Sequence, residues 1–477
     1  MKKSATFPRG GIHPKEEKHL TKNLPVEVMP LPARVSLFLK QHIGEPCAFA
    51  VKKKQLPPIN EEFLFTARHP GAIYQLLVNK KERVSEGELI GSIGKKLGAN
   101  LHASVDGTVE GVMDVPHPIE GKAPAIVLAT DPEAKPAVYS SIDWTRLSRE
   151  ELVAKITNAG IVGLGGAGFP THAKVAIKPD VKMETLILNG AECEPYLTCD
   201  HRIMVEHGDE VVEGAMILLT VLGIDSCVIG VEDNKPDAVQ ALKTAISQNS
   251  SSPGFKITVQ PLRVKYPQGA AKQLIQSITG KQVPQFGRSL DVGVIIQNVG
   301  TTRAVYQAVV LGKPLYEKTI TISGRGIGRP ANLQVKIGTS LTDIVNYLGG
   351  VKPNLARVVV GGPMMGAAVS SLDIPITKTT SGVIFLARDE IDTRDYGPCI
   401  RCGFCLDACP MGVEPNMIGL YLEAGRWNET EQFGMNACIE CGSCAFVCPA
   451  KRPLVQFVKL AKLKHRFAQR ESKKKQP

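Results

Sequence analysis

The pattern of apolar and polar positions changes several times along the chain, and each change marks a candidate domain boundary. Residues 1–44 are rich in proline and lysine with little periodicity, so we expect an extended arm that lies over a partner or another domain. Residues 45–135 carry short apolar segments separated by glycines, which is typical of β-strands and turns. Residues 136–314 alternate helical and strand patterns, and such alternation predicts a parallel sheet covered by helices.

The later regions can be divided in the same way. Within residues 136–314, strands are predicted at 185–188, 227–231, 257–262 and 292–297, and helices at about 148–159, 203–222, 235–247 and 269–279. Sheets of this kind bind ligands at the carboxyl ends of their strands. Residues 315–388 show strand, strand, helix and strand at 319–323, 333–337, 341–348 and 357–360, which predicts a β-grasp module. Residues 389–465 place short helices around cysteines, and residues 466–477 form a basic tail.

Residues 45–135 resemble the hammerhead fold of lipoyl and biotinyl carrier domains. The resemblance rests on Val84-x-x-Gly87-x-x-Ile90-Gly91 and on residues 102–109, where apolar positions alternate and glycines stand at the turns. Carrier domains modify a lysine at a hairpin tip, so Lys95 and Lys96 are considered. Neither lysine has the flanking residues that carriers use, and a purely structural sandwich is favoured.

Eight of the twelve cysteines form two copies of the pattern C-x2-C-x2-C-x3-C-P. Short C-x2-C steps let three thiolates converge on one iron–sulfur cube, while the fourth cysteine opens a helix and reaches the other cube. We therefore predict two 4Fe-4S clusters with crossed ligands. The first is assigned to Cys399, Cys402, Cys405 and Cys448, and the second to Cys438, Cys441, Cys444 and Cys409.

Zinc sites and a disulfide framework are the alternatives for these cysteines. Zinc closes with four ligands and does not need the x3-C-P ending twice. Disulfides are typical of small secreted domains, whereas this chain has 477 residues and its first residues lack the apolar core of a signal peptide. Many unpaired cysteines need a reducing compartment, so we expect a cytoplasmic protein with no membrane span, because no run of 18 apolar residues is free of charge.

The net charge of +11 is concentrated in part at the end of the chain, where residues 459–475 carry eight lysines and arginines against Glu471 alone. Such a tail can bind an acidic lipid surface, nucleic acid or an acidic protein, or it can be a solvated, frayed terminus. No base-reading module accompanies it, so no nucleic-acid partner is expected.

A glycine-rich stretch follows the first helical pattern of the α/β region. It contains Gly163, Gly165, Gly166 and Gly168, then Phe169 and Lys174. Backbone N–H groups can crowd a phosphate, the ring can stack on a flat heterocycle, and the lysine can neutralise charge. After the first strand come Asn189, Glu192 and Glu194, which suit the edge of a heterocycle or the hydroxyls of a ribose, or else form a polar loop that caps the next helix. Cys193 and Cys199 lack metal-ligand spacing and are treated as free thiols.

Taken in this order, the hammerhead, glycine loop, β-grasp and tandem cysteine motifs resemble the RnfC (RsxC) family, a component of the Rnf (Rsx) ion-translocating electron-transport complex. The middle region also resembles the NADH-oxidising, flavin-carrying subunit of respiratory complex I, through Gly165-Gly-Ala-Gly-Phe-Pro-Thr171 and Asn189-Gly-Ala-Glu-Cys-Glu-Pro195. The resemblance implies a multidomain α/β fold with a barrel-sandwich (lipoyl-like) β domain, a Rossmann-like FMN/NADH domain, a β-grasp (SLBB) domain and an α-helical two-cluster ferredoxin domain.

The resemblance also implies non-covalent FMN with NAD(H) stacked on its exposed face. The implied FMN contacts are Gly163, Gly165, Gly166, Lys174, Asn189, Glu192, Gly269, Asn298 and Thr301, and Phe169 and Glu194 would face the nicotinamide nucleotide. Gly168 and Lys272 complete the predicted cofactor-binding set. This chain departs from complex I at Gly269-Ala-Ala-Lys272, where the other family has consecutive acidic residues, and Rnf relatives often keep an acid where Ala271 stands.

The expected function follows from counting electrons. NADH releases two electrons together and an iron–sulfur cluster takes one, so a flavin must stand between them; no side-chain general base is required. We expect a peripheral NADH/FMN subunit of an ion-translocating NAD:ferredoxin oxidoreductase at the cytoplasmic face of the inner membrane. Its partners would be the other Rnf subunits, especially the iron–sulfur protein RnfB and the membrane subunits. The alternatives are a soluble cobalamin reductase and a non-catalytic, cluster-bearing docking subunit.

Overall fold

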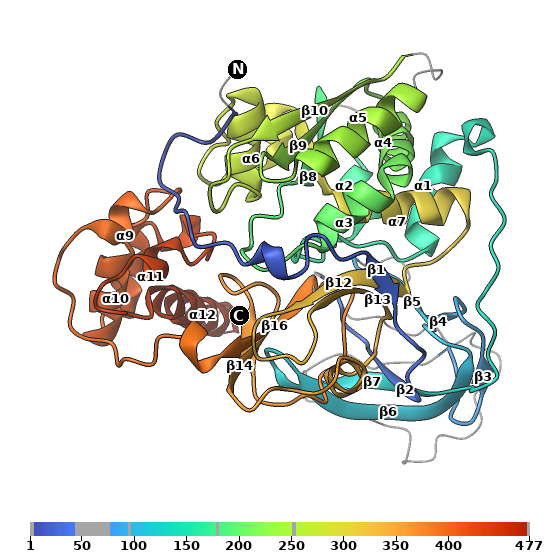
Figure 1. Cartoon of the computed structure of the whole chain (residues 1–477). Helices are drawn as coiled ribbons and strands as arrows, with labels where there is room; N and C mark the ends of the chain where they lie inside the picture. Colours follow the sequence, from blue (N-terminus) through green and yellow to red (C-terminus); the bar gives the residue numbers. More distant parts are fainter. Residues whose placement is uncertain (1–3, 43–76, 94–96, 178–180, 250–253, 475–477) are drawn as a thin grey trace.

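The computed structural model describes residues 4–42, 77–93, 97–177, 181–249 and 254–474. Figure 1 shows an α/β domain above two β regions, with the cysteine-bearing helices packed at one side of both. Within the described residues, no helix is both long enough and apolar enough to cross a lipid bilayer.

The α/β domain contains a four-stranded sheet whose strands are all parallel, in the order β10-β9-β8-β11. The strands are β8 (Thr185–Gly190), β9 (Ser226–Glu232), β10 (Lys256–Leu262) and β11 (Val294–Asn298). The helices are α1 (Arg149–Asn158), α2 (Thr171–Val175), α3 (Cys199–Glu206), α4 (Gly208–Leu222), α5 (Pro236–Gln248), α6 (Ala271–Thr279) and α7 (Val299–Val310). All four strands predicted from the sequence are present.

Three helical details of this domain differ from the prediction, of which one is the short helix α2, which was not predicted. The helix expected at 203–222 is wrong as one element, because the backbone of His207 is not helical and divides it into α3 and α4. Helix α7 was missed, since its first turn is rich in glycine and threonine, which are weak helix formers. Its start is fixed by Asn298, whose side chain accepts a hydrogen bond from the Thr301 N–H at 3.2 Å.

The first β region is an antiparallel sheet in the order β2-β7-β6-β3, accompanied by the short pair β4-β5. Its strands are β2 (Arg34–Phe38), β3 (Arg83–Val84), β4 (Leu89–Gly91), β5 (Leu101–His102), β6 (Gly107–His117) and β7 (Gly121–Thr130). Buried residues of this sheet, such as Val109, belong to the same hydrophobic core as Leu186 of β8. The candidate carrier lysines, Lys95 and Lys96, lie outside the described residues.

The second β region is a six-stranded sheet in the order β1-β13-β12-β16-β14-β15. Its elements are β1 (Val26–Val28), β12 (Glu317–Ser323), β13 (Ala331–Lys336), α8 (Leu341–Tyr347), β14 (Leu355–Val360), β15 (Ala367–Val369) and β16 (Gly382–Ala387). Strands β1 and β2 come from the N-terminal arm, so that segment supplies one strand to each β region. Earlier in the arm, Ala5 pairs with Leu262 and Ile12 with Tyr266, which lays the segment along the α/β domain (Figure 1).

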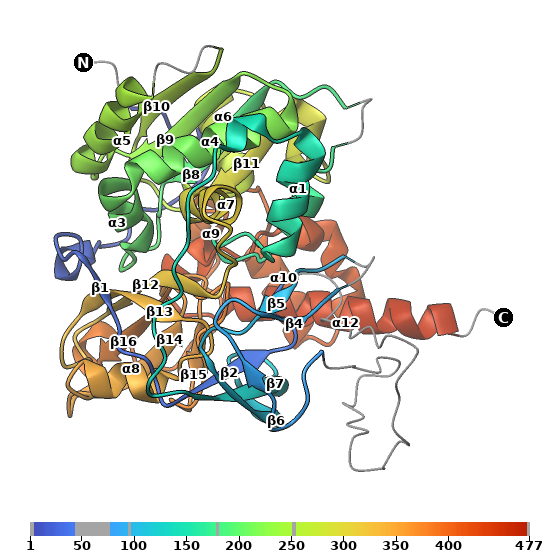
Figure 2. The ribbon, with the colours of Figure 1, turned by 90° about the vertical axis from the view of Figure 1, so that its right-hand side faces the viewer.

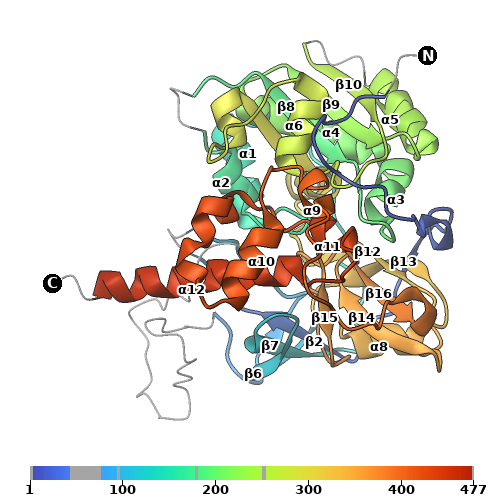
Figure 3. The ribbon, with the colours of Figure 1, turned by 90° about the vertical axis from the view of Figure 1, so that its left-hand side faces the viewer.

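The cysteine-bearing region is helical. It contains α9 (Phe404–Asp407), α10 (Pro415–Glu423), α11 (Ser443–Phe446) and α12 (Leu454–Lys474), with a 3-10 helix at Trp427–Phe433. Figure 3 shows this region covering one side of the molecule between the α/β domain and the β regions. Helix α12 continues to Lys474, so part of the segment predicted as a basic tail is helical.

Candidate functional site

The cysteines gather into two separate groups of four. One hollow, of about 370 Å³, is lined by Cys399, Cys402, Cys405 and Cys448. A second hollow, of about 360 Å³, is lined by Cys409, Cys438, Cys441 and Cys444. Each group takes three thiols from one motif and the fourth from the other motif, which is the crossed arrangement that the spacing predicts.

The backbone of the two motifs repeats the same unusual conformations. Arg401 and Glu440 have φ angles of +57° and +58°, and Gly403 and Gly442 have φ angles of +83° and +86°. Each glycine starts a four-residue helix, α9 or α11. Non-glycine residues adopt positive φ only at a cost, so its recurrence at matching positions marks two equivalent loops built to hold thiols in place.

The thiols are suited to a metal–sulfur cluster. The described cysteines form no disulfides. Backbone N–H groups already point at sulfur, since Val413 donates to Cys409 Sγ and Glu440 to Cys438 Sγ, both at 3.3 Å. Burial raises the pKa of the Cys438 thiol to about 11, so iron must displace the proton that this thiol otherwise keeps. The residues therefore fit the predicted clusters.

The glycine loop of residues 163–169 is a closed turn. The Gly163 N–H donates to the Phe169 carbonyl at 2.9 Å, and the Gly168 N–H donates to the Gly163 carbonyl at 3.2 Å. A hydrogen bond of 2.9 Å from the Leu164 N–H to Thr301 Oγ1 fixes the turn over the start of α7. The N-terminus of a helix carries free N–H groups and a positive dipole end, so this is a suitable place for a phosphate.

Two features of the loop fit a flavin phosphate. Gly166 has a φ angle of +104°, and a Cβ at this position would meet nothing within 4 Å, so the loop leaves open space beside it. Nearby, burial lowers the pKa of Lys174 to about 8. No acid and no hydrogen-bond acceptor among the described residues is paired with the Lys174 ammonium, and an anion would supply what it lacks.

Asn189, Gly269 and Asn298 are tied to the same region. Asn189 Nδ2 donates to the Gly269 carbonyl at 2.9 Å, which joins the end of β8 to the loop before α6. Asn298 Nδ2 donates to Asp200 Oδ2 at 2.7 Å, and a Cβ on Gly165 would lie 3.4 Å from Asn298 Cβ. The structure thus brings the glycine loop and the polar strand ends to one edge of the sheet.

Three predicted residues have other partners. The Glu192 carboxylate accepts the N–H groups of Asp200 at 2.7 Å and His201 at 3.2 Å, so it caps α3, as the alternative interpretation of this loop expects. Lys272 donates to the carbonyls of Pro284 and Gln285 at 2.6 Å, which directs its ammonium to that loop. Glu194 is held by the β-grasp region.

Glu194 is enclosed by the glycine-rich turn of residues 361–366. Its two carboxylate oxygens accept the N–H groups of Met364 and Met365, both at 3.0 Å. A Cβ on Gly362 would lie 2.2 Å from Glu194 Oε2, so a side chain there would displace the carboxylate from its position. On the other side of the turn, a Cβ on Gly442 would lie 2.9 Å from the Met364 carbonyl oxygen. The turn therefore packs between the α/β domain and the cysteine region.

Stability should depend on the protonation of Glu194. Burial raises the pKa of its carboxyl group to about 7, against about 4.5 in the unfolded chain. The folded state therefore holds the proton more tightly, and this stabilising contribution is lost as the pH rises from about 4.5 through 7. Gln cannot ionise but loses one of the two acceptors, so we expect the melting temperature of Glu194→Gln, taken relative to the wild type, to be higher at pH 8 than at pH 5. An equal difference at both pH values would show that Glu194 does not titrate in this range.

Lys18 of the N-terminal arm holds the loop that carries Glu192 and Glu194. Its buried ammonium donates to the carbonyls of Glu192 and Glu194 at 2.8 Å and to that of Leu197 at 2.6 Å. Sequence reasoning missed this residue, because Lys18 is one of many lysines in a segment without periodicity. Its contacts lie more than 170 positions away along the chain.

Tyr266 connects the α/β domain to the second cysteine group. Its hydroxyl donates to the Cys441 carbonyl at 2.7 Å, and its ring packs with Ile12, Ala408 and Cys441. Three residues further on, the Gly269 N–H donates to Cys193 Sγ at 3.4 Å. The group containing Cys441 therefore lies beside the candidate flavin pocket. The sequence did not predict which of the two cysteine groups would lie there.

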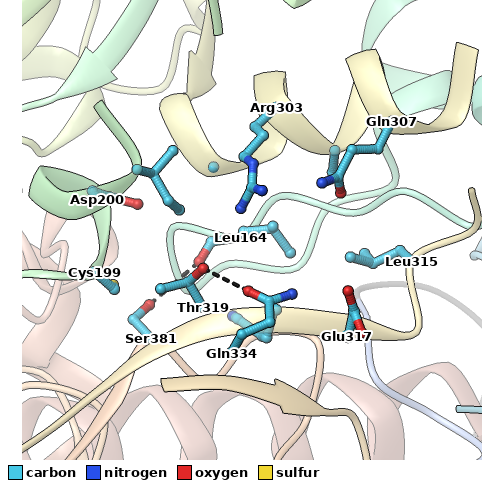
Figure 4. Close-up of a pocket in the computed structure, with 14 residues that line it drawn as sticks. Leu164, Cys199, Asp200, Arg303, Gln307, Leu315, Glu317, Thr319, Gln334 and Ser381 are labelled. Carbon is cyan, nitrogen blue, oxygen red and sulfur yellow. Dashed lines mark hydrogen bonds between the residues drawn. The ribbon is translucent and has the colours of Figure 1, made fainter. Parts of the chain in front are cut away.

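Another hollow, of about 430 Å³, lies between α3, α7 and the β-grasp sheet (Figure 4). Burial raises the pKa of the Asp200 carboxyl to about 7 and lowers that of the Lys318 ammonium to about 8. Arg303 in its lining is paired with Glu210, and Lys318 donates to the Lys378 carbonyl. The hollow is thus lined by groups that already have partners, and we assign no ligand to it.

Comparison with known families agrees with this architecture. The family described as "RnfC Barrel sandwich hybrid domain" matches residues 6–57 and 54–133, and "Nuo51 FMN-binding domain" matches residues 156–307. "SLBB domain" matches residues 319–368, and "4Fe-4S dicluster domain" matches residues 398–452. The fold and site thus define an iron–sulfur flavoprotein of electron transport.

Relatives of nearly equal length identify the family. The chain is 42% identical to the C component of the proton-translocating ferredoxin:NAD(+) oxidoreductase complex of Clostridium ljungdahlii, covering 98% of this chain and 96% of the relative. It is 37% identical to the C component of the Na(+)-translocating complex of Acetobacterium woodii, covering 96% and 97%, and 37% identical to that of the ion-translocating oxidoreductase complex of Rhodobacter capsulatus, covering 98% and 84%. The chain belongs to the RnfC family of ion-translocating oxidoreductase complexes.

A solved structure shows a similar fold. A chain of the NAD+-reducing [NiFe]-hydrogenase in the H2-reduced state aligns with a TM-score of 0.50 at 18% identity. The alignment covers 67% of this chain and 63% of that chain, which is less than two thirds of its length. At this identity the similarity concerns the fold alone.

Proposed function

We propose that this chain is the NADH- and FMN-binding electron-transfer subunit of a membrane-bound NAD:ferredoxin oxidoreductase that translocates ions. The observation that carries the proposal is the contact between the two halves: the flavin-type pocket and the Cys441 group meet through Tyr266. The names of the relatives supply the substrates, ferredoxin and NAD(+), and the coupling to ion movement.

The residues of the pocket have separable tasks. Gly163 and Gly168 close the loop, the N–H groups of Gly165 and Gly166 and the space beside Gly166 can receive the phosphate and ring of FMN, and Lys174 offers a cation. Asn189, Gly269, Asn298 and Thr301 fix the walls of this pocket. Bound FMN would supply the chemistry of taking two electrons from NADH and passing them on singly. Phe169 is half-buried at the end of the loop, where it can stack on a planar ring.

The positions of the two cysteine groups support an order of electron transfer from the flavin through one cluster to the other. The group of Cys409, Cys438, Cys441 and Cys444 would hold the cluster beside the flavin. The group containing Cys402 would hold the outer cluster, since Cys402 is exposed and its neighbours Ile400 and Phe404 are 64% and 53% exposed. An exposed apolar rim around a cluster suits docking of another iron–sulfur protein. We propose RnfB as that partner, with the membrane subunits holding this chain at the cytoplasmic face of the inner membrane.

Replacement of Lys174 tests the catalytic part of the proposal. Lys174→Met should weaken FMN binding roughly ten- to a hundredfold, because a hydrogen bond to a charged group is lost from a partly buried site. NADH-dependent reduction of a one-electron dye should fall at limiting FMN and recover when FMN is added in excess. Lys243→Met, at an exposed position on α5, is the matched control and should behave as the wild type. If the wild-type protein with intact clusters binds no flavin and reduces no dye, the chain is a cluster-bearing docking subunit instead.

A further inference from the structure

We propose that helix α12 docks directly on an anionic lipid surface through an outward apolar stripe formed by Leu460, Leu463 and Phe467. This contact is separate from attachment through partner subunits. Three observations carry it: the two apolar faces of the helix, the basic side chains that flank the outer face, and the direction in which the helix leaves the molecule.

The inner face of α12 packs against the rest of the cysteine region. Leu454, Val455, Val458 and Ala461 are buried there. Further along, His465 Nε2 lies 2.8 Å from the Trp427 carbonyl oxygen, within hydrogen-bond distance. The His465 ring also packs edge-on against the Trp427 ring. The inner face is therefore satisfied by contacts within the chain as far as His465.

The outer face carries the apolar stripe. Leu460, Leu463 and Phe467 are 43%, 44% and 54% exposed. Their spacing of three and four residues places them in one row along the helix. Val458, two residues before Leu460 and so about 200° from it around the helix, is 1% exposed on the inner face, so the stripe points away from the body of the protein. No described residue of the chain covers it enough to bury it.

Basic side chains border this stripe. Lys459, Lys464 and Arg466 are exposed on either side of it. Residues 467–475 add further lysines and arginines against Glu471 alone. An apolar row between cations is the pattern of a helix that lies in the headgroup region of an anionic membrane, with its apolar side chains inserted and its cations beside the phosphates.

The direction of the helix makes the stripe accessible. Figures 2 and 3 show the C-terminal half of α12 projecting well beyond the rest of the molecule in both views. A flat surface can contact the whole length of such a helix, and this favours lipid over an acidic protein.

Lipid docking would also orient the cysteine region. Val455 and Val458 of α12 line the hollow of the Cys441 group. The Lys462 ammonium donates to the Cys438 carbonyl at 2.7 Å and pairs with Glu440 at 2.8 Å. Because the same helix contacts this group and the proposed membrane surface, docking would set the position of the cysteine region relative to the bilayer.

Vesicle binding tests the proposal with the full chain. Purified protein is sedimented with sucrose-loaded vesicles of phosphatidylcholine, with and without phosphatidylglycerol. We expect binding to the anionic vesicles that weakens as salt is raised, and weak binding to the neutral ones. The double variant Leu463→Ser/Phe467→Ser should lower the partition coefficient at least about tenfold, since two apolar side chains can no longer be buried in the interface.

Two matched variants serve as controls. Phe286→Ser removes an apolar side chain that is 77% exposed in the α/β domain, and Lys243→Glu reverses a charge on α5. Both should bind anionic vesicles as the wild type does, whereas Lys464→Glu/Arg466→Glu should not. Equal binding by wild type and stripe variants would overturn the proposal. Absence of wild-type binding to any vesicle, with stripe-dependent binding to the membrane subunits in detergent, would overturn it in favour of a protein partner.

Discussion

Substitution of Cys448 by serine is expected to remove the outer cluster, although Cys448 belongs to the second motif. Cys448 lies with Cys399, Cys402 and Cys405 around one hollow. Iron should fall by about four atoms per chain, the content of one cubane cluster. Electron transfer to ferredoxin should fall to background while NADH-dependent dye reduction at the flavin persists, because the pocket and the inner group are untouched.

Double variants separate the crossed arrangement from an uncrossed one. Cys399→Ser combined with Cys448→Ser should lose no more iron than either single variant, because both thiols line the same hollow. Cys438→Ser combined with Cys448→Ser should lose both clusters, because these thiols line different hollows. Iron and acid-labile sulfide analysis, with electron paramagnetic resonance of the reduced proteins, measures the outcome. If Cys399→Ser/Cys448→Ser lost both clusters and Cys438→Ser/Cys448→Ser lost only one, each motif would ligate its own cluster.

Substitution of Gly166 by alanine is expected to abolish stable FMN binding. The φ angle of +104° is strained for any residue with a Cβ, at a cost of about 1–3 kcal/mol, and the added methyl group would enter the open space left for the ligand. Together these effects should weaken FMN binding roughly a hundredfold or more. Flavin fluorescence released from the denatured protein gives the occupancy, and NADH-dependent dye reduction should fall with it.

Gly254→Ala is the matched control for this variant. Gly254 has a φ angle of +120°, and a Cβ there would also meet nothing within 4 Å. Its backbone strain should be similar, but it lies in the turn before β10, away from the glycine loop. It should keep full flavin occupancy. Loss of flavin in both variants would mean that general destabilisation, and not the shape of the pocket, explains the result.

Features that depend on local spacing could be predicted from the sequence. The spacing of the cysteines predicted which thiols lie together, because each loop is so short that its own residues determine its geometry. The strands at 185–188, 227–231, 257–262 and 292–297 were recognisable because buried parallel strands are short apolar runs between polar segments. The glycine loop could be recognised for the same reason, since its turn closes on itself.

Features that depend on contacts between distant segments could not be predicted from the sequence. Strands β1 and β2 pair with β13 and β7, far along the chain, and the arm alone shows no strong strand pattern. The hydrogen bonds of Lys18 to the loop of residues 192–197 leave no local signal. Glu194 was expected to face the nicotinamide nucleotide, but its partners in the structure are N–H groups of a turn 170 residues later. Which residues face NADH therefore stays a prediction.

The break between α3 and α4 shows how an apolar pattern can mislead. Residues 203–222 are apolar on both sides of the polar segment 206–210, and a helix can cross such a segment with its polar side chains exposed, so one helix was predicted. The chain changes direction there, and the two helices pack differently: α3 contacts the β-grasp strand β12, and α4 packs along α7. The break places Cys199 and Asp200 at the start of a short helix whose first N–H groups are capped by Glu192.

The cofactor content of the protein purified without oxygen is the most direct test of whether one polypeptide holds both a flavin and two iron–sulfur clusters. We predict about eight iron atoms, about eight acid-labile sulfides and one FMN per chain. Zinc in place of iron, or fully loaded clusters with no flavin bound even after addition of FMN, would contradict this arrangement.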